Sequence, residues 1–397
     1  MSRASSGLSP RILSATIPVA FVVIVAGPNL PNPLLPLYGR TLGLDPADLS
    51  IVYSSFLITL TATLAVMARP RLQSRPGAAL VAALLMAVVA DVVLSLATHP
   101  ALIVGRALNG ISLGLGTGAA ASLALALRGE RARTIAATGT IVGAVVGSIF
   151  AVTLAQFGPA PLLAGYAIHA AVTCAALIAV IVGLIRWPRS SWALDRQVAV
   201  NTAIPHDLPA RWTGYLMGSL AWISGGIIVA LVPLAISQDL NTTSLLIAGL
   251  GTIALLVFAN IGQFSVGGRS IRHMSALAMI CMGAGVVVIA ASVAGGLVPF
   301  VVVGCAFVGF GQGAGYRLGL RIASAGLTPR LQGGRASVYA GISYAACALF
   351  VIASGELATR VGLTNGLWIV AAVLTPLFVV AASTASRRAR KRVPQHS

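Results

Sequence analysis

Long apolar runs, repeated along the whole chain, constrain the fold of this sequence more than any other feature. A helix needs about 20 consecutive apolar residues to cross the hydrocarbon core of a bilayer. Twelve such runs occur within the 397 residues, at 12–37, 48–68, 78–97, 101–126, 134–157, 162–185, 213–236, 243–264, 274–295, 298–320, 336–356 and 363–384. The sequence therefore predicts an all-α integral membrane protein with twelve transmembrane helices.

Composition excludes a soluble protein. Only 9% of the residues are charged and 57% are hydrophobic, whereas soluble domains carry about 25% charged residues. The formal net charge is +18, but a nucleic-acid-binding face needs basic residues clustered on a soluble scaffold. Here they stand singly or in small groups between apolar runs, so we expect no nucleic-acid partner. The four cysteines lie inside apolar runs without C-x-x-C spacing, and we expect no disulfide, metal site or cofactor.

The basic residues also orient the predicted spans. Lys and Arg accumulate in the cytoplasmic loops of membrane proteins. With both termini in the cytoplasm, all but three of the 26 Lys and Arg residues lie on the inner side or at inner helix ends. The exceptions are Arg40, Arg106 and Arg360. We therefore expect cytoplasmic termini, a multi-pass protein of the cell membrane, and a basic cytoplasmic tail at 386–397.

A polar segment at 186–212 divides the spans into two sets of six. It predicts an N-terminal half at 1–185, a cytoplasmic central loop and a C-terminal half at 213–385. Shifted by 199 residues, "VGRALNGISLGLGTG" at 104–118 aligns with "VGCAFVGFGQGAGYR" at 303–317, and four glycines fall on glycines. Both copies run toward the cytoplasm, so we expect parallel repeats about an axis along the membrane normal, an architecture of secondary transporters.

Three stretches resemble motifs of the major facilitator superfamily. "PRLQSRPGAA" at 70–79 is similar to the family's loop motif, the fourth span carries an R-x-x-x-G pattern, and the fifth span resembles the motif of drug:proton antiporters. The matching residues are Leu72, Arg75 and Gly77 in the loop, Arg106, Gly110 and Gly114 in the fourth span, and Gly143 and Gly147 in the fifth. The block "PLYGRTLGLDPADLSIVYSSF" at 36–56 also resembles bacterial drug-efflux members. In the fifth span the expected proline is Ser148, which leaves the antiporter assignment open.

Charged residues inside a membrane are costly and are commonly functional. Asp91 in the third span and Arg106 in the fourth are equally distant from the short turn at 97–100. Both should therefore lie about 11 Å in from that turn at a rise of 1.5 Å per residue. We expect them to pair, either as a static clamp or as a pair that opens when Asp91 takes up a proton. Rotation of the helix could defeat the pairing. The lone His169 in the sixth span is expected to be packed.

The resemblance implies that the first, fourth, seventh and tenth spans line a central cavity. Prolines at the end of the first span predict a broken helix there, because they leave backbone carbonyls without donors. The candidate cavity residues are Asn29, Asn32, Asn109, Thr117, Trp222, Gln312 and Tyr316. For each of them, interhelical packing is the competing interpretation. The glycines of the fourth and fifth spans are expected to allow close helix packing.

These patterns favour a secondary active transporter that works by alternating access and exports a small organic or amphipathic compound in exchange for protons. The open alternative is a proton symporter or facilitator that imports a small metabolite. A membrane-embedded enzyme or a receptor is a second alternative, but the spans hold one deep carboxylate and one histidine, and we expect no enzymatic activity. No P-loop pattern for an ATP-driven pump occurs. We expect a monomer whose partners are its substrate, protons and lipid.

Overall fold

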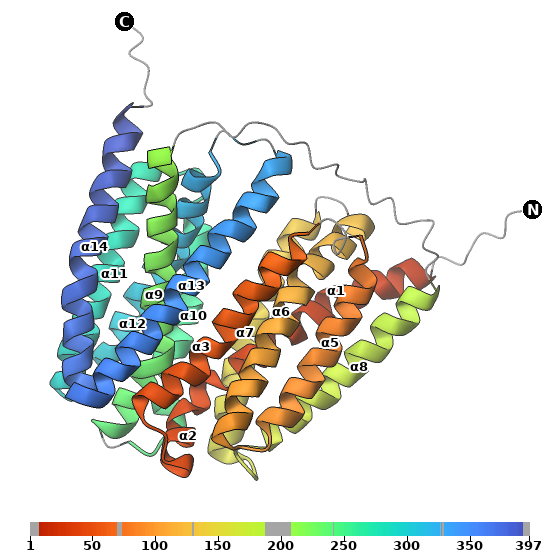
Figure 1. Ribbon diagram of the computed structural model, residues 1–397, viewed down its shortest axis with the longest axis horizontal. Helices are drawn as coiled ribbons and strands as arrows, with labels where there is room; N and C mark the ends of the chain where they lie inside the picture. Colours follow the sequence, from red (N-terminus) through yellow and green to blue (C-terminus); the bar gives the residue numbers. More distant parts are fainter. Residues whose placement is uncertain are drawn as a thin grey trace, which may run out of the picture. The chain divides into compact units, whose positions relative to one another are not determined.

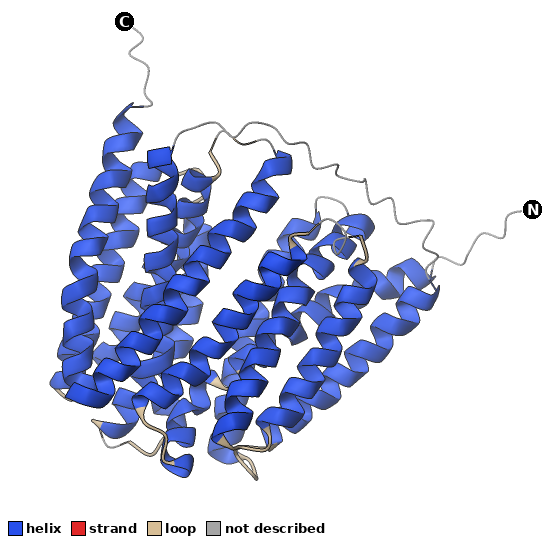
Figure 2. Cartoon of the chain, in the orientation of Figure 1, coloured by secondary structure: helices blue, strands red, loops and turns tan. Residues whose placement is uncertain are grey.

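The computed structural model describes residues 8–69, 74–128, 131–186, 208–240, 242–325, 327 and 329–391, and these form helices, turns and short connections (Figure 2). Within this part of the chain there are twelve long helices (Figure 1). They are α1 (Leu8–Ala26), α3 (Pro46–Met67), α5 (Pro76–Leu94), α6 (His99–Arg128), α7 (Arg131–Phe157), α8 (Ala164–Arg186), α9 (Leu208–Gln238), α10 (Leu245–Ser265), α11 (Ile271–Ala294), α12 (Val298–Ala323), α13 (Pro329–Val361) and α14 (Leu363–Lys391).

Each of the twelve predicted runs overlaps one of these helices, and the first run extends beyond α1. Eleven stretches of the described residues are long and apolar enough to cross a membrane. The described apolar part of α7, Val142–Phe157, is shorter than the other stretches. The protein is therefore a multi-pass membrane protein of the all-α class.

The first predicted span is broken near its end, as its prolines predict. Helix α1 stops at Ala26 and is followed by two single 3-10 turns, η1 (Gly27–Asn29) and η2 (Asn32–Leu34), before the short helix α2 (Leu35–Leu42). Proline lacks the N–H that would continue the ladder, and its ring clashes with the preceding turn. Prolines at 28, 31, 33 and 36 therefore prevent a regular α-helix through this segment.

The chain forms two compact units. Unit 1 contains residues 1–31 and 59–201, and unit 2 contains residues 32–58 and 202–397. The first half of α3 thus packs within unit 2, where the Ser54 hydroxyl donates to the Ala348 carbonyl at 3.1 Å. The second half packs within unit 1, where the Thr59 hydroxyl donates to the Ala107 carbonyl at 2.8 Å. One continuous helix therefore contributes to the packing of each unit.

The two copies of the glycine run contact corresponding helices. Gly105 of α6 lies against α5, and Gly304 of α12 lies against α11. Gly114 of α6 lies against Thr63 of α3, and Gly313 of α12 lies directly against the backbone of α10. In the predicted repeat, α5 corresponds to α11 and α3 to α10. The contacts identify these glycines as positions at which two helices pack closely.

Helix α7 also packs closely, against α1. A Cβ atom at Gly143 would lie 2.6 Å from the Val22 carbonyl oxygen, and one at Gly147 would lie 2.7 Å from the Ala26 carbonyl oxygen. Small residues at four-residue spacing let two helix backbones approach in this way. This packing holds α7 against the end of α1, directly before the break.

Candidate functional site

Unit 1 contains a buried ionisable pair that joins three helices. Asp91 of α5 is 1% exposed and His169 of α8 is 6% exposed. The His169 Nδ1 atom lies 2.6 Å from the Asp91 Oδ2 atom. The other ring nitrogen, Nε2, lies 3.0 Å from the carbonyl oxygen of Val23 in α1. The pair therefore connects α5 and α8 to the last turn of the first helix.

The predicted pairing of Asp91 with Arg106 is not present in this structure. The guanidinium of Arg106 is 1% exposed and donates from one of its terminal nitrogens to the Pro28 carbonyl, within the break. Equal distance from the turn determines how deep two residues lie along their helices, but not the direction in which each side chain points. Asp91 points toward α8 and Arg106 toward the break in the first span, so the two charged groups have different bonding partners.

His169 is buried, in keeping with the prediction of a packed residue, and its ring is also the partner of Asp91, a contact that was not predicted. It is the histidine inside a predicted span, and Asp91 is the deep carboxylate, so their rarity is a signal that sequence analysis could have used. That signal is weak, because the sequence does not show that α8 packs against α5.

Asn109 of α6 adds an amide to this cluster. It is 1% exposed, and neither its Oδ1 nor its Nδ2 atom has a hydrogen-bond partner among the described residues. A Cβ atom at Gly27 would lie 3.2 Å from His169 Cε1 and 3.3 Å from Asn109 Oδ1. Glycine at the start of the break therefore leaves room for both polar side chains. We call Asp91, Arg106, Asn109 and His169 the unit 1 polar cluster.

The remaining residues predicted in the first half lie in different surroundings. The Asn29 amide donates to the Val25 carbonyl at 2.8 Å, which places it at the break. Asn32 is buried in η2, within unit 2. Thr117 is exposed and donates to Leu113 of its own helix at 2.7 Å. In the loop motif, Arg75 is exposed directly before α5 and Gly77 is buried in its first turn. Leu72 lies outside the described residues.

Unit 2 contains a row of aromatic rings that includes two predicted cavity residues. Trp222 of α9 lies edge-on to Tyr344 of α13, with ring centroids 4.5 Å apart, and to Tyr316 of α12 at 6.0 Å. The ring centroid of Tyr316 lies 5.0 Å from that of Tyr339, and the ring centroid of Tyr339 lies 5.9 Å from that of Tyr215. We call these five residues the aromatic row. The sequence identified only Trp222 and Tyr316, because the rotation of α13 was not predictable.

Gln312, the third cavity residue predicted in the C-terminal half, points toward α9. A Cβ atom at Gly225 would overlap its amide group, and its Oε1 atom is buried without a hydrogen-bond partner among the described residues. Gln312 is one turn from Tyr316 on α12. The amide therefore adds a hydrogen-bonding group beside the aromatic row.

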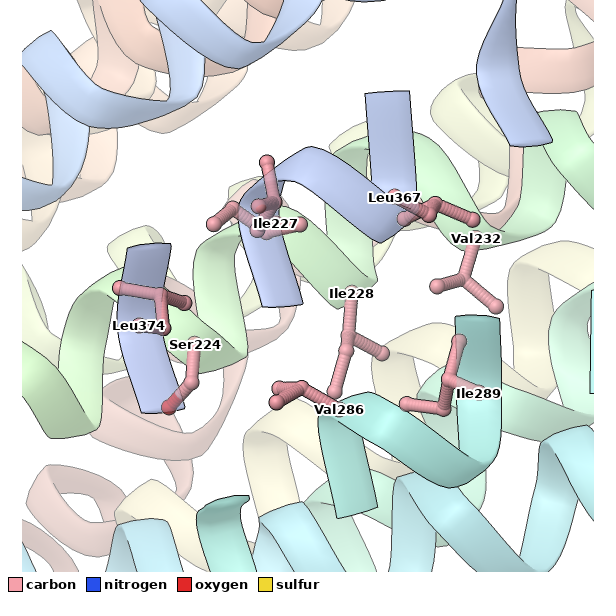
Figure 3. Close-up of a pocket in the computed structure, with 9 residues that line it drawn as sticks. Ser224, Ile227, Ile228, Val232, Val286, Ile289, Leu367 and Leu374 are labelled. Carbon is pink, nitrogen blue, oxygen red and sulfur yellow. The ribbon is translucent and has the colours of Figure 1, made fainter. Parts of the chain in front are cut away.

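A small apolar pocket lies elsewhere in unit 2, between α9, α11 and α14 (Figure 3). Its lining is aliphatic apart from Ser224, whose hydroxyl donates to the Leu220 carbonyl of its own helix at 2.8 Å. Apart from this hydroxyl, the lining of the pocket has no polar side chain. Among the described residues, no group of three or more His, Cys, Asp or Glu could hold a metal ion.

Comparison with known proteins gives structural matches only. The sequence matches no protein-family model and no curated protein. A bacterial homologue of the human lysosomal transporter Spinster, inward-facing and unoccupied, matches with a TM-score of 0.72 at 12% identity, over 97% of this chain and 98% of that one. The nucleoside transporter NupG matches with a TM-score of 0.65 at 14% identity, over 94% and 98%. At these identities the likeness shows the fold alone, which this chain shares with both membrane transporters.

Proposed function

We propose that this protein is a secondary active transporter of the cell membrane that moves a small organic compound by alternating access. The fold is shared over nearly the whole chain with a nucleoside transporter and with a bacterial homologue of a lysosomal transporter. The two compact units support the proposal, because alternating access requires two bodies that can move against each other. We further propose cytoplasmic termini, the two six-helix halves of the sequence prediction, and a monomer.

We propose that transport is coupled to protons at Asp91. The observation that carries this proposal is the hydrogen-bonded chain from Asp91 through His169 to the Val23 carbonyl, beside the break in the first span. Buried ionisable residues in membrane helices commonly mark proton relays, and broken helices commonly form transport sites. Here the two features are in direct contact.

The aromatic row and Gln312 support a substrate with a flat ring and at least one hydrogen-bonding group. Aromatic rings bind flat apolar surfaces by offset stacking or edge-on contacts, while few polar groups fix the orientation of a ligand. An amphipathic ring compound fits this description, and so does a nucleoside, the kind of compound for which the transporter NupG is named. We propose export in exchange for protons; import together with protons is the alternative.

Transport by the purified protein in proteoliposomes tests these proposals. The pH gradient is imposed in each direction, and the flux of ethidium, tetraphenylphosphonium and uridine is followed. We expect at least one probe to accumulate on the side from which protons leave. Accumulation in the direction of proton movement would overturn export and support import. Probe flux that does not depend on the pH gradient would overturn proton coupling. The absence of flux for all three probes would overturn the proposed substrate class.

The role of Asp91 is tested in the same assay with Asp91→Asn. We expect it to lose gradient-driven flux, because an amide cannot exchange the proton. The matched control is Glu356→Gln, which makes the same chemical change at an exposed carboxylate paired with Arg360 in unit 2. Unchanged gradient-driven flux in Asp91→Asn would exclude this residue as the coupling group.

A further inference from the structure

The bonding pattern around His169 determines how many protons the pair holds. The Val23 carbonyl oxygen can only accept a hydrogen bond, so the Nε2 atom that contacts it at 3.0 Å must carry a hydrogen. The Nδ1 atom lies 2.6 Å from Asp91 Oδ2. A contact that short between a ring nitrogen and a carboxyl oxygen needs a hydrogen between them. The structure thus contains the proton-loaded form, written either as imidazolium with carboxylate or as neutral imidazole with carboxylic acid.

Loss of that shared proton makes the two contacts incompatible. A neutral imidazole has one N–H donor, while the carboxylate of Asp91 and the carbonyl of Val23 are both acceptors. If Nε2 keeps the hydrogen, the lone pair of Nδ1 faces the carboxylate. If Nδ1 takes the hydrogen and bonds the carboxylate, the lone pair of Nε2 faces the Val23 oxygen. The proton-free pair can keep one of its two hydrogen bonds, but not both.

From this we infer that one proton shared by Asp91 and His169 fastens the end of α1 to α8, and that its release detaches the Val23 carbonyl. The carboxylate, as the charged group, retains the remaining N–H because hydrogen bonds to ionised acceptors are the stronger ones. The contact to Val23 is therefore the one that is lost. This inference rests on the proposed proton coupling and adds the event through which the proton reaches the broken span.

Release of the shared proton affects the end of α1 because of where Val23 lies. Val23 lies one turn before Gly27, where α1 ends and η1 begins. Ring atoms of His169 would lie within 4 Å of a Cβ atom at Gly27, so the imidazole contacts both the last turn of α1 and the first residue of the break. Detachment of Val23 leaves this segment held by Arg106 at Pro28 and by the packing of α7.

Other ionisable groups on the neighbouring helices set the electrostatic background. Helices α1, α6 and α7 pack around α5 and α8. Besides the pair itself, the described charged or titratable side chains on these helices are His99, Arg106, Tyr166, Cys174 and Arg186. Arg106 and Tyr166 are fully buried. Because Arg106 keeps its positive charge, the cluster of Asp91, His169 and Arg106 has a net charge of +1 with the shared proton and 0 without it.

The proton count can be measured directly by nitrogen NMR of the full chain in lipid nanodiscs with ¹⁵N-labelled histidine. His169 is assigned as the signals that disappear in His169→Gln. At low pH we expect both ring nitrogens of His169 to be protonated or to share a proton, and at high pH we expect Nε2 to become bare. A hydrogen on Nε2 at every pH, with Nδ1 bare throughout, would overturn the inference.

The detachment of α1 is measured by hydrogen exchange of the backbone amides in residues 23–30, corrected for the intrinsic effect of pH. We expect exchange in the wild type to rise by about tenfold as the shared proton leaves, the equivalent of one net hydrogen bond. In the double variant Asp91→Asn/His169→Gln, the introduced glutamine amide can donate to the Val23 carbonyl and accept from the introduced asparagine, so both bonds persist without a titratable proton. We call it the locked variant, and its corrected exchange should not depend on pH.

Controls separate this inference from a general loss of structure and from the proposed function. His273→Gln changes an exposed histidine of α11 and should keep the pH dependence of the wild type. If the locked variant does not fold, Asp91→Asn alone serves, because its amide can donate to Nδ1 while Nε2 keeps the bond to Val23. The same pH dependence in the locked variant as in the wild type would overturn the inference. Neither the NMR measurement nor hydrogen exchange requires a substrate. The detachment of Val23 can therefore be confirmed when the transport assay fails, and transport can be confirmed when the detachment is not observed.

Discussion

Among the residues that the structure describes, Arg106 has the largest fully buried side chain. A buried guanidinium is costly unless its hydrogen-bonding groups are matched. Part of this requirement is met by the Pro28 carbonyl, which lies in the break and so is available to a side chain. The prolines that interrupt the first span thus create an acceptor for the arginine of the fourth span.

Arg106→Lys should therefore destabilise the protein while retaining the positive charge. The shorter ammonium lacks the planar fork of the guanidinium, and hydrogen bonds to charged groups contribute about 1.5–3 kcal/mol each. We expect a loss of about 2 kcal/mol, measured as a shift in thermal unfolding in detergent. The matched control is Arg75→Lys, at an exposed position before α5, which should have no measurable effect. Equal unfolding temperatures for the two variants would show that the Pro28 contact contributes nothing.

Three members of the unit 1 polar cluster were predictable from the sequence, but their hydrogen-bond partners were not. Asp91, Arg106 and Asn109 are polar residues within apolar runs, and such residues are visible in a sequence because they are rare there. Their hydrogen-bond partners depend on the rotation of each helix about its axis and on which helices are neighbours. Neither the rotation nor the neighbours of a span that is apolar on all sides can be read from a single sequence. For this reason the contact between His169 and Asp91 was not predicted.

Among the helices, the contact between α1 and α7 restricts side-chain size at a defined position. At Gly147 an added methyl group would meet backbone atoms of Ala26 at 2.7–2.9 Å, and a backbone cannot move aside as a side-chain end can. At Gly118, also inside a helix, nothing lies within 4 Å of the added atom. Both glycines are helical, but only Gly147 lies against the backbone of another helix.

Gly147→Ala should destabilise the protein by about 1–3 kcal/mol, the usual cost of overpacking. Gly118→Ala should be neutral or stabilising by up to about 1 kcal/mol, because alanine favours the helix. Thermal unfolding of both variants in the same detergent tests this difference. A similar decrease in both would mean that glycine is required for reasons other than the approach of α1.

The existence of the helices was largely predictable, since length and hydropathy determine it. The break after α1 was also predictable, because its cause is the local chemistry of proline. The aromatic row was not. Tyr339 and Tyr344 are separated from Trp222 by more than 100 residues, and only the packing of α13 on α9 brings their rings together.

For the whole molecule, the distribution of basic residues makes a prediction about topology. If both termini are cytoplasmic, a green fluorescent protein fused to the C-terminus should fluoresce, and alkaline phosphatase fused there should be inactive. A phosphatase fused within the turn at 97–100, which is predicted to be external, should be active. The opposite pattern would reverse the orientation and would place most of the basic residues on the translocated side, against the positive-inside rule.

If a proton on the Asp91–His169 pair is exchanged for substrate, substrate binding must release it. This release is measured by adding ethidium to the purified protein in weakly buffered detergent solution and following a pH indicator. We expect release from the wild type and from His273→Gln, and none from the locked variant, which has no proton to give up at this site. Equal proton release from the locked variant and the wild type would show that the exchanged proton does not come from this pair.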